Sequence, residues 1–475
     1  MEREIKLSDM ILTKGCVKNY HWGKKGGDSY IARFQSVAPK PPSPELNALK
    51  FDDQTPMAEL WFGSHPSGPA TLAIGDQIIK LNKFLAREPE MVGVVEKYLK
   101  YNKQLPFLFK ILSVAEPLSL QAHPDKKLAA ILHKQDPKNY PDSNHKPELA
   151  IALTDFHVLC DFRPHEEILN FLKLVGPLKA VVGEKNYQHY KEVFESSTST
   201  STTTTTSTTT STPTSTSTTT STTTSTLSRK EADENHRANL RLALAACFKS
   251  LMTSQKEVIL KETEKLKLGD VQTIGKDLQK LIMDLAQLYP GDPGVFAPFF
   301  LNYLKLNPGE GVFLKPNKLH AYLKGECIEC MACSDNVVRA GLTTKFRDVL
   351  TLVNMLDYES VKSGKDLILA AAQGVDSSGC SCTSRGGYSV TMYKTPTEEF
   401  KVEKLTVANK TDVTLDSKLS GSFLIVLSGK ATTRDFFDLK QEHIMGFGFA
   451  AYIPPKIEPK IFDIKGTLIM YRAYC

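Results

Sequence analysis

Apolar and polar positions divide the chain into two kinds of region. Short apolar or alternating runs, separated by Pro, Gly and Asp, predict β-strands in residues 105–123, 311–322 and 423–471. Apolar residues at helical spacing mark the middle of the chain instead, at residues 163–194, 231–267 and 271–288. The pattern therefore predicts a mainly β protein that is interrupted by an inserted helical region.

A tract of serine and threonine interrupts the helical region. Every residue from 196 to 226 is Ser or Thr except Pro213. Such a tract has no apolar side chains whose burial would offset the entropy lost on ordering, so we predict a disordered loop over residues 196–226. We interpret it as a tolerated insertion without a function of its own.

Length and composition indicate a soluble protein of two or three domains. The chain has 475 residues, of which 41% are hydrophobic and 24% charged. Its net charge of +6 is small for this length, so we expect no nucleic-acid partner. The charged N-terminus lacks the apolar core of a secretory signal, and no apolar run is long enough to predict a membrane span. The nine cysteines are sparse and odd in number, which indicates reduced thiols and a cytoplasmic location.

Polar residues alternate with apolar ones in the segment 117–124. If this segment is a strand, Ser119, Gln121 and His123 point to one face and the apolar residues point to the other. Such a face is often only the solvent side of a strand. The nearly continuous apolar run just upstream, residues 106–114, predicts a buried sheet, however, and a polar face inside a buried sheet is a candidate site.

Two further residues extend this candidate site. Glu148 lies where a polar loop enters an apolar run, and His320 follows a strand and a turn in residues 311–322. Together with His123 and the amide of Gln121 they form a mixed nitrogen and oxygen set that suits Zn²⁺, with Fe²⁺ or Mn²⁺ as alternatives. Gln is an unusual zinc ligand, and each residue taken singly is a weak signal.

Long strings of the sequence resemble a known family. These are SLQAHPDKK (119–127), YPDSNHKPELAIAL (140–153), AYLKGECIECMACSDNVVRAGLTTKFRDVLTL (321–352) and the segments 15–23 and 58–63. They resemble the type I mannose-6-phosphate isomerases, zinc enzymes of the cupin superfamily. The resemblance spans most of the chain outside the helical region, and it implies one Zn²⁺ per chain, held by Gln121, His123, Glu148 and His320. The Ser/Thr tract has no counterpart in the family pattern.

The resemblance also implies a fold with two cupin, or jelly-roll, β-barrels and a helical domain. We expect residues 1–162 to form the first part of the catalytic cupin barrel and residues 163–294 the helical insert. Residues 295–350 would complete the catalytic barrel, and residues 351–475 would form a C-terminal jelly-roll domain. We expect a monomer.

The implied reaction interconverts D-mannose 6-phosphate and D-fructose 6-phosphate and feeds GDP-mannose synthesis. A proton moves between C2 and C1 through an enediolate, which requires a base, an acid and a group that stabilises the oxyanion. The phosphate dianion also requires cations or hydrogen-bond donors. The sugar phosphate is the only partner that we expect, and neither nucleic acid nor membrane is implied.

The resemblance implies a role for Arg339 and a place near the pocket for Trp22 and Glu59, and the chemistry of the reaction suggests further candidates. Arg339 would be the catalytic arginine, although a salt bridge with Asp335 is the alternative. Lys146 is a candidate for proton transfer or orientation, and Glu329 and Asp335 are candidate general bases. The candidate substrate-binding residues are Ser119 and Lys345, for the phosphate, and Trp22, Glu59 and Tyr322, near the pocket.

Two other functions remain open. One is a non-catalytic sugar-phosphate-binding cupin, and the other is a cupin oxygenase with a two-histidine, one-carboxylate iron site, although the extra ligand Gln121 disfavours it. The spacing of Cys327, Cys330 and Cys333 also resembles part of an iron–sulfur or zinc site. A strand would place Cys330 on the face opposite the other two, so we interpret these cysteines as packing thiols.

Overall fold

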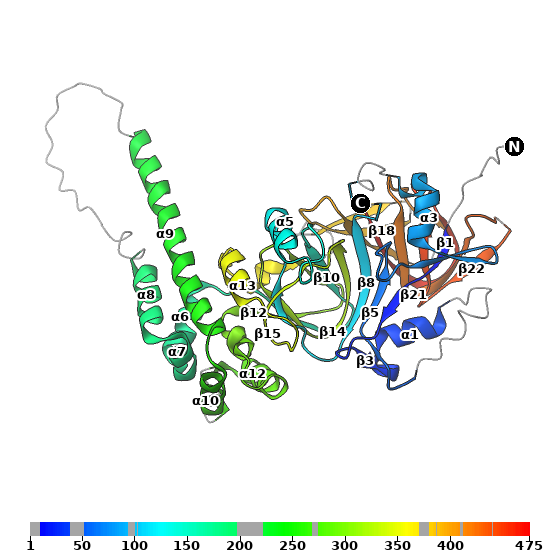
Figure 1. Cartoon of the computed structure of the whole chain (residues 1–475). Helices are drawn as coiled ribbons and strands as arrows, with labels where there is room; N and C mark the ends of the chain where they lie inside the picture. Colours follow the sequence, from blue (N-terminus) through cyan, green and yellow to red (C-terminus); the bar gives the residue numbers. More distant parts are fainter. Residues whose placement is uncertain are drawn as a thin grey trace, which may run out of the picture.

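The computed structural model describes residues 10–38, 52–93, 100–101, 103–196, 222–267, 274–369, 380–385, 387–408, 412–438 and 440–475. These residues form an elongated molecule with β-sheets over most of its length and a group of helices at one end (Figure 1). The predicted mainly β architecture with a helical region is confirmed.

One large sheet carries most of the candidate site. Its main path runs β16 (Ile368–Leu369), β13 (Gly311–Leu314), β10 (Glu148–Ala152), β14 (His320–Ala332), β8 (Phe107–Val114), β5 (Glu59–Phe62) and β2 (Cys16–Lys18). The strands attached to this path are β9 (Leu120–Ala122), β11 (Phe156–Phe162), β12 (Leu301–Leu306) and β15 (Val338–Gly341). The long strand β14 pairs with both groups, so it connects the two halves of the sheet.

The extra length of β14 is accommodated by a bulge. His157 of β11 is paired with Lys324 and Val158 with Tyr322, so β14 holds one more residue than its partner here. Gly325 has φ +105°, and a Cβ at this position would lie 2.4 Å from the carbonyl oxygen of Asp155. Side chains alternate between the two faces of a strand, and one extra residue shifts this alternation by one position. Even-numbered residues of β14 before the bulge therefore share a face with odd-numbered residues after it.

A second large sheet contains the C-terminal strands. Its path is β17 (Cys380–Arg385), β18 (Tyr388–Tyr393), β19 (Lys401–Val407), β24 (Lys460–Tyr474), β21 (Ser422–Arg434), β23 (Ala450–Ile453), β1 (Ile11–Lys14), β6 (Thr71–Ile74) and β7 (Gln77–Lys80), with β20 (Asp412–Thr414) and β22 (Glu442–Met445) attached. Strands β3 (Lys24–Lys25) and β4 (Pro56–Met57) form a separate pair. The first described strand thus joins strands from the C-terminal part of the chain, with Ile11 opposite Tyr452.

The two large sheets share one apolar core. The ring of Phe423 on β21 lies 6.0 Å from that of Phe62 on β5 and 6.4 Å from that of Phe107 on β8. The core cluster around these rings also contains Ile328 and Cys330 of β14. The face of β14 opposite the candidate site therefore fixes the sheet against the C-terminal strands.

The helical region follows β11. It consists of α6 (His165–Leu174), α7 (Gly176–Val182), α8 (Glu184–Glu195), α9 (Thr222–Met252), α10 (Lys256–Lys267) and α12 (Lys276–Leu288), and η4 (Pro293–Phe299) leads back to the sheet. Their buried apolar residues form one cluster with residues of β9, β11 and β15. The helices therefore pack directly onto the part of the sheet that carries the site (Figure 1).

Short helices also occur outside the helical region, at positions for which the sequence analysis predicted no element. They are η1 (Gly26–Asp28), α1 (Tyr30–Val37), α3 (Leu81–Arg87), η2 (Pro89–Val92), α5 (Lys126–Gln135), α13 (Val349–Met355) and η5 (Gly364–Leu367). The start of α5 has a clear local cause, because the side chain of Asp125 accepts hydrogen bonds from the backbone N–H groups of Lys127 and Leu128.

The predicted disordered loop over residues 196–226 needs a correction at its ends. Most of it, residues 197–221, lies outside the described residues. Ser196 caps the C-terminus of α8, and residues 222–226 form the start of α9 rather than part of a loop. An existing helix extends at little cost because each added residue gains a hydrogen bond, so even Thr and Ser can continue it.

Three further predictions concern the whole chain. The domain boundaries stay a prediction, although β1, β6 and β7 pair with the C-terminal strands. All nine cysteines are free thiols, and Cys327 and Cys330 pack in different core clusters, as the strand alternation predicted. Within the described ranges, no helix combines the length and apolar character needed to cross a membrane.

Candidate active site

Three strands place three polar side chains in a row. Gln121 on β9 is paired with His320 on β14 and, on its other side, with Arg339 on β15. Residues directly opposite each other in antiparallel strands point to the same face of the sheet. The predicted strand alternation is confirmed here, because Leu120 and Ala122 are buried in the core while Gln121 faces the other way.

The two histidines and Glu148 form a compact, buried group. Their ligand atoms all lie within 4.8 Å of one another, and this is the one such group of His, Cys, Asp or Glu residues within the described part of the chain. Glu148 Oε1 lies 3.3 Å from His123 Nε2, and Glu148 Oε2 lies 3.4 Å from His320 Nε2. All three residues are at most 2% exposed. The structure therefore brings together three of the four predicted ligands.

Backbone carbonyls orient both imidazole rings. The Nδ1 atom of His123 donates to the carbonyl oxygen of Asn336 at 2.7 Å, and that of His320 donates to the carbonyl oxygen of Lys318 at 3.1 Å. Each Nε2 atom is then a lone-pair acceptor that faces the carboxylate of Glu148. Among the described residues, no atom is within hydrogen-bonding geometry of the buried Nε2 of His123. A lone pair aimed at a carboxylate oxygen is unfavourable unless a cation lies between them, so this arrangement fits a metal ion.

The protonation states agree with this interpretation. Burial lowers the pKa of His123 to about 4, which keeps the ring neutral at physiological pH. Burial alone would raise the pKa of Glu148, but the charge of Lys146, whose Nζ lies 3.0 Å away, and the two histidines hold it well below its usual range. Neutral imidazoles and an ionised carboxylate are the forms that bind zinc.

Gln121 is placed beside this group with its amide nitrogen inward. Its Nε2 lies 3.4 Å from His320 Nε2, while its Oε1 accepts a hydrogen bond from Ser119 at 2.8 Å. A glutamine binds a metal through its oxygen, so the amide must turn over to act as a ligand. Gln121 therefore stays a prediction as the fourth ligand.

A cleft of about 400 Å³ lies in front of the histidines. Gln121 and Glu148 reach its wall, whereas His123 and His320 lie behind them. All the other predicted site residues line this cleft, namely Trp22, Glu59, Ser119, Lys146, Tyr322, Glu329, Asp335, Arg339 and Lys345. The helical region contributes Leu288 and Tyr289 to the wall. The bulge of β14 explains how Tyr322 and Glu329 reach the same cleft.

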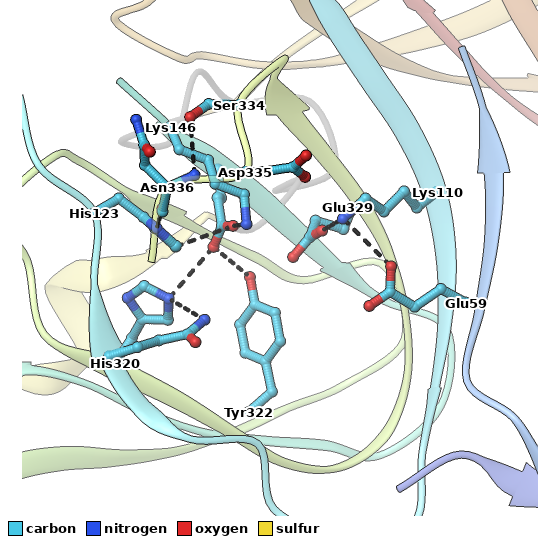
Figure 2. A network of polar contacts seen from close by, with 12 residues as sticks. Glu59, Lys110, His123, Lys146, His320, Tyr322, Glu329, Ser334, Asp335 and Asn336 are labelled. Carbon is cyan, nitrogen blue, oxygen red and sulfur yellow. Dashed lines mark hydrogen bonds and ion pairs between the residues drawn. The ribbon is translucent and has the colours of Figure 1, made fainter. Parts of the chain in front are cut away.

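Lys110 is the main residue that the sequence analysis missed. It lies on β8, 95% buried, and its Nζ is 2.7 Å from Glu329 and 3.5 Å from Glu59 (Figure 2). Burial disfavours its charge, but these two carboxylates outweigh burial and raise its pKa. The sequence did contain a sign of this role, because Lys110 is the one charged residue in the apolar run 106–114. A charged residue in a buried strand needs polar partners, so it could have been predicted to face the site.

The carboxyl of Glu329 differs from that of Asp335. Burial raises the pKa of Glu329 despite the opposing charge of Lys110, and the nearby Glu148 adds to the rise. The pKa of Asp335 is lowered, chiefly by a hydrogen bond from His65, whose Nε2 lies 3.3 Å from Asp335 Oδ2. The cleft therefore contains one carboxyl that retains its proton more readily and one that loses it more readily.

Arg339 and Lys345 form a positively charged corner. Burial lowers the pKa of both, and the charge of Arg339 adds to the effect on Lys345. The alternative salt bridge between Arg339 and Asp335 is wrong, because the two side chains, both described, form no ion pair and Asp335 is paired with His65. Two neighbouring cations that form no ion pair with a described carboxylate suit an anionic ligand.

Comparisons with known proteins agree with this site. The profile of the phosphomannose isomerase type I catalytic domain matches residues 10–165, and the profile of that family's helical insertion domain matches residues 216–301. The human protein named mannose-6-phosphate isomerase is 36% identical over 474 residues, which cover 97% of both chains. The fission yeast (Schizosaccharomyces pombe) protein of the same name is 35% identical and covers 98% of this chain and 100% of its own.

Solved structures give the same result. A zinc-bound mannose 6-phosphate isomerase superimposes with a TM-score of 0.71 at 26% identity and covers 98% of this chain and 99% of its own. A variant of phosphomannose isomerase from Salmonella typhimurium superimposes with a TM-score of 0.73 at 25% identity, with the same coverage. Similarity of this extent, together with a metal-binding group where the resemblance required one, assigns the chain to the type I phosphomannose isomerase family.

Proposed function

We propose that this chain is a zinc-dependent aldose–ketose isomerase. It would interconvert D-mannose 6-phosphate and D-fructose 6-phosphate by proton transfer through an enediolate and so feed GDP-mannose synthesis. The observation that carries the proposal is the buried group of His123, Glu148 and His320 at the base of a cleft with acid, base and cationic side chains.

The metal would be held by His123, Glu148, His320 and the amide oxygen of Gln121. Bound Zn²⁺ supplies positive charge that stabilises negative charge developing on a substrate oxygen. The hydrogen bond from Ser119 to Gln121 supports this ligand set, because the hydroxyl can accept from the amide nitrogen once the oxygen turns inward.

Two carboxyls with opposite pKa shifts supply the acid and the base. We assign Asp335, whose pKa is lowered, as the base that removes the proton, because it is ionised at neutral pH. Asp335 would return this proton to the adjacent carbon, and Glu329, whose pKa is raised and which contacts Lys110, would give a proton to one substrate oxygen and take one from the other. Lys146 would orient the substrate oxygen nearest the metal ligands, since its Nζ already contacts Glu148.

The charged corner of the cleft would bind the phosphate. Lys345 and the hydroxyl of Ser119 are the proposed phosphate contacts, and Arg339 would stabilise the enediolate next to them. Trp22, Glu59 and Tyr322 would contact the sugar, because they line the same cleft. The hydroxyl of Tyr322 lies 3.5 Å from Glu148 Oε2, which supports a place close to the metal.

We also propose the finer features of the fold and of the setting. The two large sheets would form the cupin barrels of the family, with the domain limits at residues 162, 294 and 350. The protein would act as a cytoplasmic monomer. Its one partner would be the sugar phosphate.

The test is metal analysis of the purified protein combined with a coupled assay for fructose 6-phosphate. We expect about one zinc per chain and turnover of mannose 6-phosphate that a chelator removes and zinc restores. Metal and sugar-phosphate binding without turnover would point to the non-catalytic cupin. Iron in place of zinc, with oxygen consumption, would point to the oxygenase.

A further inference from the structure

His65 lies directly behind Asp335, outside the wall of the cleft. It belongs to the loop after β5, and its side chain is 10% exposed, whereas that of Asp335 is 46% exposed. The Nε2 atom of His65 lies 3.3 Å from Oδ2 of Asp335. His65 thus contacts one oxygen of the Asp335 carboxylate from outside the cleft, while Asp335 itself lines the cleft.

The loop around His65 fixes which ring nitrogen carries the proton. The backbone N–H of Ser67 donates to Nδ1 of His65 at 3.3 Å, and the hydroxyl of Ser67 lies 2.7 Å from the same atom. Because Nδ1 accepts, the proton of the neutral ring is on Nε2, which faces Asp335. The tautomer that donates to the carboxylate is therefore set by the protein backbone.

The ring itself has little freedom to turn. Trp61 packs edge-to-face against it, with ring centroids 5.4 Å apart at 87°. The carbonyl of Ser67 accepts a hydrogen bond from Lys18 at 2.6 Å, and Lys18 also lies 4.3 Å from the Trp61 ring centroid. The donor that meets Asp335 is thus anchored on β5 and its loop, and not on the segment that carries Asp335.

We propose that His65 is a positioning residue for the reaction. Its Nε2–H holds one oxygen of Asp335, keeps the carboxylate ionised and aims the other oxygen at the substrate proton. The inference rests on the proposed function, in which Asp335 is the base. The backbone N–H of Asp335 donates to Asp142 at 2.8 Å, so main chain and side chain of Asp335 are anchored separately.

Several charged groups face Asp335 from the surrounding elements. The hydrogen bond from His65 contributes most to lowering the pKa of this carboxyl, and the charges of Lys146 and Lys110 contribute less. The carboxylate of Asp142 lies beside its backbone. Removing the His65 donor should therefore raise the pKa of Asp335 while the lysines keep it below that of an isolated buried carboxyl.

The test compares His65→Leu with His65→Gln in the zinc-loaded enzyme. Leucine removes the donor, whereas the amide nitrogen of glutamine reaches the position of Nε2. For His65→Leu we expect kcat to fall roughly tenfold and the acid limb of kcat/KM to move up by about one pH unit, with metal content unchanged. His65→Gln should recover most of both effects. His189→Leu, an exposed position on α8, is the matched control and should behave as wild type.

Asp335→Asn separates this inference from the proposed function. If Asp335→Asn keeps full turnover, the assignment of the base is wrong. If it lowers turnover, adding His65→Leu should cause no further loss, because both changes act on one carboxylate. An equal loss from His65→Leu in both backgrounds would overturn the positioning role. The positioning role would also be overturned if the acid limb of kcat/KM did not move in His65→Leu. It would be overturned as well if His65→Gln lost as much activity as His65→Leu and showed the same fall in melting temperature.

Discussion

His320 is the proposed ligand that ties the metal site to the completed fold. It is the first residue of β14, far along the chain from Gln121 and His123, and its Nδ1 is held by the carbonyl of Lys318. Replacing His320 with Ala removes one of the two imidazoles that face Glu148. We expect loss of most bound zinc and a fall in turnover of about 100-fold or more.

The measurement is zinc content by elemental analysis together with kcat. The helical region should stay folded, so the far-ultraviolet circular dichroism of His320→Ala should match that of the control His189→Ala, which changes an exposed histidine on α8. Full zinc content with full turnover would contradict the ligand assignment.

Arg339 is predicted to act on the reaction rather than on the metal. It lies opposite Gln121 but forms no ion pair with any described residue. Arg339→Ala should lower kcat by about 100-fold and leave zinc content nearly unchanged, because a charge that stabilises the enediolate acts in the transition state. Steady-state kinetics decides the role. A normal kcat with a raised KM would move Arg339 to phosphate binding, and wild-type kinetics would reduce it to a structural residue.

At the residue scale, the sequence predicted the candidate ligands better than the residues that surround the cleft. His123, Glu148 and His320 were predicted as ligands because the strings around them resemble a family, and the structure places them together. Lys110 and His65 were missed. Lys110 matters because it contacts Glu329, and His65 because it contacts Asp335. Each partner lies more than two hundred residues away in the chain, and strand alternation alone does not show which distant residues meet.

At the element scale, β14 shows what the pattern cannot predict. The sequence analysis expected a strand ending at Tyr322 and a second apparent strand around the cysteines, whereas the structure has one continuous strand from His320 to Ala332. The bulge before Gly325 reverses which positions face the cleft. A bulge is defined by the neighbouring strand, so the sequence of β14 alone could not show that Tyr322 and Glu329 share a face.

Deleting the Ser/Thr tract tests whether this insertion in the helical region has a function. We predict that excising residues 197–226 and joining Ser196 to Leu227 leaves zinc content and kinetics nearly unchanged. The excised tract offers no apolar area to bury, and loop-closure entropy changes by only about 0.6 kcal/mol per doubling of loop length. The start of α9 extends past α8 in Figure 1, so its first turns are expected to unwind at the new junction.

The helices that contact the site lie at the other end of this region. Tyr289, which follows α12, donates from its hydroxyl to the carbonyl of Pro117 at 2.9 Å, just before the ligand strand β9. The measurement is therefore kcat, KM and melting temperature of the excised protein. Loss of isomerase activity in a protein that still binds zinc would mean that the tract covers the active site and that our interpretation of the insertion is wrong.

At the scale of the whole molecule, Glu399 joins the C-terminal sheet to the segments that carry the site. It lies between β18 and β19 and is 3% exposed. Its Oε1 accepts hydrogen bonds from Tyr101 at 2.7 Å and Lys126 at 2.9 Å, and lies 2.8 Å from His145 Nε2. Burial alone would raise the pKa of Glu399, but the bonds from His145, its neighbour Thr397, Tyr101 and Lys126 together lower it.

This junction predicts a pH-dependent stability. Because the folded pKa of Glu399 lies below the unfolded value of about 4.3, the ionised carboxylate stabilises the protein above that pH, and the contribution is lost as the pH falls below it. Glu399→Gln should lower the free energy of unfolding by about 2 kcal/mol at pH 7. Urea denaturation at pH 7 and pH 4 measures this, and the difference from wild type should shrink at the lower pH.

The matched control for this prediction is Glu458→Gln, which removes an exposed carboxylate elsewhere in the C-terminal part of the chain. It should change the free energy of unfolding little at either pH. An equal destabilisation by Glu399→Gln at both pH values would show that packing, and not the charge, matters at this position.

The pairing of β1 with β23 has a consequence for biosynthesis. The ribosome makes Ile11 near the start and its partner Tyr452 near the end. At about 5–20 residues per second, β1 waits on the order of tens of seconds with an apolar, unpaired edge. A chain cut short before β23 would contain all four proposed metal ligands and the neighbouring strand β6, and still leave the other edge of β1 unpaired. Nascent and truncated forms of this enzyme should therefore depend on chaperones and be substrates for quality control, however complete their active-site sequence is.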